Sequence, residues 1–231
     1  MNKLYPTHER FRAFQGEGVH MGRPAFFIRT YGCPVKCPFC DSAGTWHPQF
    51  VPKDIERLSV EQLVQEAAET LCEFVVITGG EPTVHDLTAL VTGLAERGIP
   101  SHLETSGAFE FDGMMFDWVT LSPKRWKMPL EQNYEQANEF KLIIEKPEDI
   151  RFYTHPIEEH CHSLGTTPIW LHPEWSQREN SEVLGAICEA VEKGGGLYRA
   201  GWQLHKCYRV DQRDNRTRAN VPLGGNPEKG Y

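Results

Sequence analysis

Short runs of apolar and β-branched residues alternate along this chain with segments that have helical periodicity. One such run, residues 25–31, precedes a helical pattern over residues 59–72, and a second run at residues 74–78 follows it. Alternation of this kind is typical of βα units, which place parallel strands side by side in one sheet. We therefore expect an α/β fold with mostly parallel strands. The other expected strands are residues 101–105, 118–121, 140–144, 168–172 and 197–203.

Capping residues indicate where the helices begin and end. Ser59 and Gln62 have the spacing of a capping box at the start of the first helix. Asp86 is expected to cap a second helix, which Gly98 would end. A third helix should cover residues 181–193, because consecutive glycines follow it.

Length and composition suggest one main domain. A chain of 231 residues is long enough to bury a sizeable core. From Asp211 onward the sequence is polar and rich in glycine and proline. We therefore expect one domain over residues 1–210, followed by a C-terminal tail or covering loop over residues 211–231.

The charge and hydropathy of the chain limit its partners and its location. The net charge of -8 argues against a large nucleic-acid-binding face, because phosphate recognition needs clustered Lys and Arg. No apolar run is long enough to span a bilayer, and residues 1–10 lack the apolar core of a secretory signal. We expect a cytoplasmic protein that binds neither nucleic acid nor a membrane.

Three of the seven cysteines crowd into residues 33–40, which is not the pattern of a disulfide framework. They form the motif Cys33-Pro-Val-Lys-Cys37-Pro-Phe-Cys40, directly after the first expected strand. Three thiolates can hold three irons of a 4Fe-4S cluster and leave the fourth iron open for chemistry. Other interpretations stay open: a thioredoxin-type pair of Cys37 and Cys40, a zinc site completed by His47, or unrelated core cysteines. The redox pair does not need Cys33 and should open a helix, whereas the residues that follow favour a loop.

A glycine-rich segment, Thr78-Gly79-Gly80-Glu81-Pro82, follows the next expected strand. By itself it is only a turn between a strand and a helix, although glycines also let the backbone approach a ligand. In parallel βα folds, the loops at the carboxyl ends of the strands build the active site. The cysteine motif and this segment are therefore expected to share one site.

The cysteine motif, with an aromatic residue before its last cysteine, and the later Gly-Gly-Glu-Pro resemble the radical S-adenosylmethionine superfamily. A further ordered set of motifs is similar to the 7-carboxy-7-deazaguanine synthase family over most of the chain. The resemblance implies a partial (βα) barrel of the radical S-adenosylmethionine type, with residues 1–210 as its catalytic domain. The further motifs lie at residues 14–18, 27–29, 103–107, 121–124 and 203–206.

The same resemblance implies a lyase reaction. Members of the family convert 6-carboxy-5,6,7,8-tetrahydropterin to 7-carboxy-7-deazaguanine by a radical ring contraction with loss of ammonia, in queuosine-type 7-deazapurine biosynthesis. The implied cofactors are a 4Fe-4S cluster, S-adenosylmethionine and Mg²⁺. The implied partners are an electron donor such as flavodoxin or ferredoxin and a second copy of the chain in a homodimer.

The resemblance also assigns roles to residues, motif by motif. Cys33, Cys37 and Cys40 would hold the cluster, and Ser42 would approach Mg²⁺. His205 is the one candidate for a catalytic side chain, because the cofactor radical carries the chemistry. The expected contacts to S-adenosylmethionine are Phe39, Asp41, Gly79, Gly80, Glu81, Gly107, Ser122, Pro123, Lys124 and His172. The expected contacts to the pterin are Phe14, Gln15, Gly16, Glu17, Arg29, Thr105 and His205.

Several of these residues also have a plainer interpretation. Arg29 could be a surface charge, but it stands in an apolar run, and a buried guanidinium needs an anionic partner such as a carboxylate. His205 is equally compatible with a buried core histidine. Lys124 could be a solvated charge, and Phe14 could be an ordinary core residue.

This sequence departs from the family pattern in three places. Ser42 stands where related sequences often have Thr, and His172 stands where they often have Gln. The chain also continues through residues 207–231, where related chains often end and their terminal carboxylate joins the site. Two other functions stay open: a different radical S-adenosylmethionine enzyme, such as a glycyl-radical activase, and a zinc-binding module.

Overall fold

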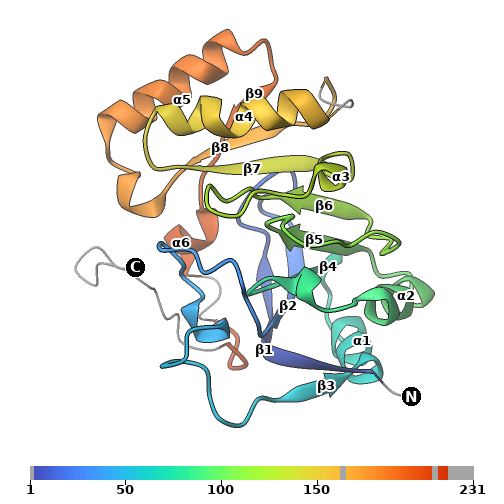
Figure 1. Cartoon of the computed structure of the whole chain (residues 1–231). Helices are drawn as coiled ribbons and strands as arrows, with labels where there is room; N and C mark the ends of the chain where they lie inside the picture. Colours follow the sequence, from blue (N-terminus) through green and yellow to red (C-terminus); the bar gives the residue numbers. More distant parts are fainter. Residues whose placement is uncertain (1–2, 162–164, 210–212, 218–231) are drawn as a thin grey trace.

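The computed structural model describes residues 3–161, 165–209 and 213–217 (Figure 1). Within these ranges one sheet has the strand order β3-β1-β2-β4-β5-β6-β7-β8-β9. All neighbours from β2 to β9 are parallel, whereas β1 is antiparallel to both β2 and β3. The strands are β1 (Leu4–Phe14), β2 (Pro24–Thr30), β3 (Arg57–Ser59), β4 (Phe74–Gly79), β5 (Ser101–Thr105), β6 (Trp118–Leu121), β7 (Glu139–Ile144), β8 (Ile169–Pro173) and β9 (Tyr198–Ala200).

The predicted α/β fold, a partial barrel with mostly parallel strands, is confirmed. β3 and β9 are the two ends of the strand order, so the sheet does not close. β1 was not predicted, because His8, Glu9, Arg10 and Arg12 interrupt any regular apolar alternation in it. Pairing with β2, the next strand, and with the more distant β3 orders this strand.

The helices are α1 (Val60–Ala68), α2 (Thr88–Glu96), α3 (Glu131–Tyr134), α4 (Glu148–His160), α5 (Ser181–Lys193) and α6 (Leu204–Tyr208). The capping box is confirmed: Ser59 Oγ accepts the Gln62 N–H at 3.2 Å, and Gln62 Oε1 accepts the Ser59 N–H at 2.9 Å. α1 ends four residues before the predicted end at residue 72. Asp86 accepts the N–H of Thr88, the first residue of α2, at 3.0 Å. α4 was not predicted, because it contains Pro156 and is rich in charged residues.

The helices pack on one face of the sheet, and the other face carries polar side chains beside a small apolar cluster of Ala25, Phe74 and Val76. α1 and α2 bury Leu63 and Leu90 against apolar residues of β2, β4 and β5. α4 and α5 similarly cover β7 and β8. Successive side chains of a strand point to opposite faces, so the residues between the core positions point inward. The inner positions include Arg29 on β2, Glu104 on β5 and Lys141 on β7.

Candidate active site

A cavity of about 270 Å³ lies at the carboxyl ends of the parallel strands. Loops after β2, β4, β5, β6 and β8 line it, together with side chains from the inner face of the sheet. The cavity brings together nearly all of the predicted site residues. The exceptions are Gly107, Pro123 and His172, which do not line it. Residues that line it without having been predicted as site residues include Glu104, Lys141, Trp175, Gln203 and Lys206.

The three motif cysteines enter the cavity from the loop that follows β2. All three are half-buried free thiols. Trp46 Nε1 donates a hydrogen bond to the Cys40 sulfur at 3.4 Å. Burial raises the pKa of Cys37 to about 12, although the nearby Lys124 ammonium acts in the opposite direction. Soft sulfur donors that face one cavity fit an iron–sulfur cluster, and Cys33, Cys37 and Cys40 are the residues that would hold it.

The other interpretations of the cysteine motif fit this geometry less well. The ring of His47 meets Trp46 edge to face and lies tilted against Phe50, and its Nδ1 accepts the N–H of Gln49 at 3.4 Å. In the part of the chain that the structure describes, no three His, Cys, Asp or Glu side chains are placed to hold one metal ion. A structural zinc site needs four such ligands. No described α-helix begins at Cys37, which separates this loop from a thioredoxin-type pair.

β4 ends in two glycines because the loop after it packs directly on the loop after β2. A Cβ at Gly79, whose φ is +149°, would lie 2.5 Å from the backbone nitrogen of Thr30. A Cβ at Gly80 would lie 2.4 Å from the carbonyl oxygen of Gly32. The N–H of Gly80 donates to Thr30 O at 3.0 Å, and that of Glu81 donates to Gly32 O at 2.8 Å. The glycines therefore fix the start of the cysteine loop.

The side chain of Glu81 joins the loops after β4 and β5. It is 1% exposed. Its Oε1 accepts the hydroxyl groups of Thr105 at 2.6 Å and Thr83 at 2.8 Å, and its Oε2 accepts the N–H of Ser106 at 2.8 Å. Thr105 thus gives its hydroxyl proton to Glu81, so a contact with a pterin would use another atom of this residue. The contacts of both residues with bound molecules stay predictions.

Arg29 lies on the inner face of β2, beneath the cysteine loop. Its Nε donates to Glu9 Oε1 at 2.7 Å, and its Nη1 donates to Ser42 Oγ at 3.2 Å. The Ser42 hydroxyl donates to Asp41 Oδ1 at 3.2 Å, and the Lys206 ammonium lies 3.4 Å from Asp41 Oδ2. A buried arginine needs an anionic partner, and Glu9 of the chain itself supplies one on the Nε edge.

Lys141 occupies the centre of the inner face, between two carboxylates. Its Nζ lies 2.5 Å from Glu17 Oε2 and 3.0 Å from Glu104 Oε2, and Gln15 Nε2 donates to Glu104 Oε1 at 2.8 Å. Burial raises the pKa of Glu17, but the Lys141 ammonium outweighs burial and holds that pKa well below its usual range. Burial lowers the pKa of Lys141, but the two carboxylates outweigh it and raise that pKa above its usual value. Glu17 and Lys141 are therefore both ionised near neutral pH.

The two predicted histidines occupy different positions. His205 lines the cavity from α6 and packs so closely on Gly16 that a Cβ there would lie 2.3 Å from its Nδ1. His172 is fully buried behind the cavity, against Gly201 and 4.0 Å from Glu17. Burial lowers the pKa of His172 to about 4, so its ring is neutral at neutral pH. The predicted contact of His172 with S-adenosylmethionine stays a prediction.

The loops after β5 and β6 contain four further predicted residues, Gly107, Ser122, Pro123 and Lys124. Lys124 is not a solvated charge, because it lines the cavity and its ammonium donates to Ser122 Oγ at 2.7 Å. Gly107 has a φ of +74°, and a Cβ there would lie 2.4 Å from Leu121 Cδ1. Close packing of the two loops therefore explains Gly107 without a ligand.

Two predicted aromatic residues mark opposite sides of the cavity. The ring of Phe14 meets that of Tyr208 edge to face at 5.6 Å, and the ring of Phe39 meets that of Trp126 in the same way at 5.7 Å. Phe14 and Phe39 both line the cavity, so neither is an ordinary core residue.

Comparisons with known proteins agree with this geometry. The sequence pattern of the Radical SAM superfamily matches residues 27–150. The 7-carboxy-7-deazaguanine synthase of Synechocystis sp. is 46% identical over 202 residues, which cover 87% of this chain and 91% of that protein. The chain belongs to the 7-carboxy-7-deazaguanine synthase family. The synthase of Prochlorococcus marinus is 34% identical over 89% of this chain and 98% of that protein. The crystal structure of QueE from Escherichia coli is 30% identical, covers 87% of this chain and 95% of that protein, and gives a TM-score of 0.76.

Membership in the synthase family confirms the family predicted from the motifs. It implies a 4Fe-4S cluster and S-adenosylmethionine as cofactors, and the three motif cysteines lie within the matched residues. The likeness to QueE supports the partial barrel. Among the described residues, no helix combines the length and the apolar character needed to cross a membrane.

Four charged residues of this synthase-family site were not predicted. Lys141 and Glu104 could have been predicted from the sequence. Each is a charged residue within a short strand, as Arg29 is, and that was the feature that singled out Arg29. Glu9 carried no such signal, since it lies among other charged residues of an unpredicted strand. Lys206 was noted only as part of a motif, and its pairing with Asp41 depends on the position of α6.

Proposed function

We propose that this chain catalyses the reaction of its family, the conversion of 6-carboxy-5,6,7,8-tetrahydropterin to 7-carboxy-7-deazaguanine with loss of ammonia. The observation that carries the proposal is the cavity beside the cysteine loop, whose inner face combines a guanidinium, an ammonium and several carboxylates. A carboxylated pterin has an anionic group and an amine-bearing edge, so it needs both kinds of partner. The product would serve queuosine-type 7-deazapurine biosynthesis.

The loops at the mouth of the barrel hold the cofactors. Cys33, Cys37 and Cys40 would hold the cluster, which would supply the electron for reductive cleavage of S-adenosylmethionine. The chain itself contributes placement and the exclusion of water. The residues assigned to S-adenosylmethionine are Phe39, Asp41, Gly79, Gly80, Glu81, Ser122 and Lys124, all of which line the cavity.

The inner face binds the pterin. Arg29 meets the substrate carboxylate through its Nη edge, because Glu9 already holds its Nε. Lys141 keeps Glu17 ionised and pairs with Glu104, and carboxylates accept hydrogen bonds from the amine-bearing edge. The other residues assigned to the pterin are Phe14, Gln15, Gly16, Thr105 and His205.

The enclosure of the cavity favours a small molecule over a protein substrate. α6 meets the loop after β1, where the N–H of Leu204 donates to Gly16 O at 3.0 Å. A glycyl-radical activase would need an open groove for a protein segment at this place. The pterin is therefore the better-supported substrate.

Three further properties belong to the proposal through the family. We propose a homodimer and an electron donor such as flavodoxin or ferredoxin. We also propose a cytoplasmic location, because an iron–sulfur cluster requires reduced cysteines.

Anaerobic turnover tests the proposed function directly. The purified, reconstituted protein should be brown and should convert carboxytetrahydropterin, in the presence of S-adenosylmethionine and a reductant, to the deazapurine and ammonia. Both products are measured by mass spectrometry and an ammonia assay. Formation of 5′-deoxyadenosine without any deazapurine would point to a different substrate within the superfamily.

Ser42→Ala is expected to retain the cluster and S-adenosylmethionine binding but to lose most of the stimulation by Mg²⁺. Mg²⁺ prefers hard oxygen ligands, and the Ser42 hydroxyl lies beside the Asp41 carboxylate. Ser42→Thr keeps the hydroxyl group and should keep the response. The measurement compares turnover of the three proteins before and after chelation, at matched iron content. Equal stimulation of Ser42→Ala and the parent would place the ion elsewhere.

A further inference from the structure

The short helix α6 places two residues at the cavity. It has five residues, none of them buried, and a helix of this length is marginal without outside support. His205 and Lys206 of α6 line the cavity. The hydrogen bond from Leu204 to Gly16 fixes the start of the helix. At its other end Tyr208 meets Phe14 edge to face, and the position of this exposed end also depends on where the following chain is held.

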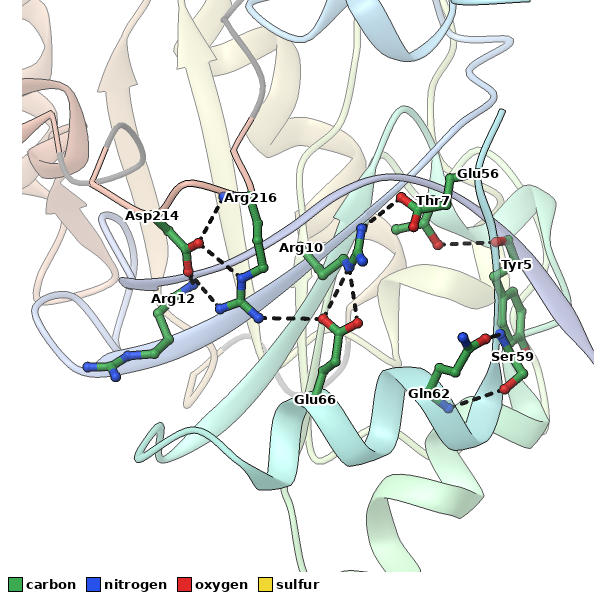
Figure 2. A network of polar contacts seen from close by, with 10 residues as sticks. All are labelled: Tyr5, Thr7, Arg10, Arg12, Glu56, Ser59, Gln62, Glu66, Asp214 and Arg216. Carbon is green, nitrogen blue, oxygen red and sulfur yellow. Dashed lines mark hydrogen bonds and ion pairs between the residues drawn. The ribbon is translucent and has the colours of Figure 1, made fainter. Parts of the chain in front are cut away.

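Beyond α6, the described residues 213–217 lie against β1, where Asp214 binds the strand (Figure 2). Asp214 Oδ2 accepts the backbone N–H of Arg12 at 3.0 Å. β3 pairs with β1 only over residues 4–6, so in the described ranges no strand covers the edge of β1 at Arg12. The carboxylate thus satisfies an N–H group on an open strand edge. Thr217 closes the turn, because its N–H and Oγ1 donate to Asp214 O at 3.2 and 2.8 Å.

Arg216 links the same turn to α1. Its Nη2 and Nε bind the two carboxylate oxygens of Asp214 at 2.7 and 3.0 Å, and its Nη1 lies 3.5 Å from Glu66 Oε2. Glu66 binds Arg10 at 3.1 Å, and Arg10 binds Glu56 at 2.7 Å. Figure 2 shows these charges alternating in sign across β1 and α1. The Asp214 side chain is only 11% exposed, so solvent screens this pairing less than it screens a surface ion pair.

We propose that Asp214 and Arg216 form a clasp that positions α6, and with it His205 and Lys206, over the cavity. The proposal rests on the proposed function for what the cavity holds. The reason is that the two segments are joined by the chain. An extended chain spans roughly 3.3–3.6 Å per residue, so Tyr208 can lie at most about 20 Å from Asp214. A fixed Asp214 therefore limits how far the end of α6 can leave the cavity. Neither residue of the clasp lines the cavity, so both are positioning residues.

Two alanine variants and a matched control test the clasp in the reconstituted holoenzyme. Asp214→Ala and Arg216→Ala each remove one half of the clasp, whereas Arg213→Ala removes a charge at an exposed position of the same segment. In both clasp variants we expect KM for carboxytetrahydropterin to rise at least about fivefold while kcat changes less than about twofold. This pattern is expected when a mutation weakens binding of the substrate and of the transition state equally. Trypsin cleavage after Lys206 should be at least about fivefold faster, because cleavage follows the population of the displaced helix. Arg213→Ala should match the parent in both measurements.

Iron content and melting temperature separate positioning from a general folding defect, and both should stay near the parent values. An unchanged KM in the two clasp variants overturns the proposal whether or not proteolysis accelerates, and so does an equal effect of Arg213→Ala. If either alanine variant fails to fold, Asp214→Asn and Arg216→Lys decide by the same measurements. The trypsin result does not depend on the substrate. Faster cleavage of the clasp variants in a protein without synthase activity would refute the proposed function and not the clasp, whereas unchanged cleavage refutes the clasp alone.

Discussion

Replacing Cys37 by Ala is expected to abolish cluster assembly and all activity that depends on cleavage of S-adenosylmethionine. Three thiols face the cavity from one loop, and three protein ligands are the minimum that leaves a single open iron. Loss of one thiol leaves two irons without a protein ligand, so the same result should follow for Cys33→Ala and Cys40→Ala. Iron and sulfide content, the visible absorption of the cluster, and 5′-deoxyadenosine formation measure the effect.

Cys188 provides the matched control for this prediction. It is an exposed free thiol on α5, away from the residues that line the cavity. Cys188→Ala should keep the iron content, the colour and the activity of the parent. Full iron content in Cys37→Ala would contradict the assignment of the motif and reopen the other interpretations of these cysteines.

Replacing Lys141 by Met is expected to give the second large effect, on both turnover and stability. The substitution leaves the buried Glu17 and the partly buried Glu104 without their shared cation, and an uncompensated buried charge costs about 3–5 kcal/mol. Turnover should fall by about 100-fold or more, because a change of about 1.4 kcal/mol in binding corresponds to a factor of ten. Steady-state kinetics and thermal unfolding measure the two effects. Lys146→Met is the control, since Lys146 is exposed and follows the same strand.

The same variant should change how stability depends on pH. In the parent, the Lys141 ammonium holds the pKa of Glu17 below its unfolded value of about 4.3, so this stabilisation is present above that pH and is lost as pH falls through the folded pKa. Without Lys141, burial dominates and raises the folded pKa of Glu17. The folded state then binds more protons than the unfolded state, so stability falls as pH rises. The loss in melting temperature should therefore be smaller near about pH 5 than near about pH 8.

A charge-neutral triple variant completes this test. Adding Glu17→Gln and Glu104→Gln to Lys141→Met removes the unpaired charges, so most of the melting temperature should return while turnover stays low. A Lys141→Met protein with the stability and KM of the parent would show that the three charges are not coupled as their distances indicate.

The sequence by itself determined the parts of this protein that depend on neighbouring residues. The cysteine spacing, the capping box of Ser59 and Gln62, and most of the parallel strands and their order along the chain could be predicted, because each rests on local chemistry or periodicity. The motifs also indicated most of the residues that line the cavity. The position of these motifs after strands was sufficient to predict that they share one site, because a parallel sheet gathers all such loops at one edge.

Only the tertiary structure decided the features that depend on residues far apart in the chain. β1 is ordered by pairing with β2 and β3, and not by an apolar pattern of its own. Arg29 pairs with Glu9 on β1, and Lys141 pairs with Glu17 in the loop after β1 and with Glu104 on β5. These pairings could not be predicted from local sequence. His172 is a motif position that packing places behind the cavity. Asp214 looked like part of a polar tail, and it binds the edge of β1 because folding leaves the N–H of Arg12 unpaired there.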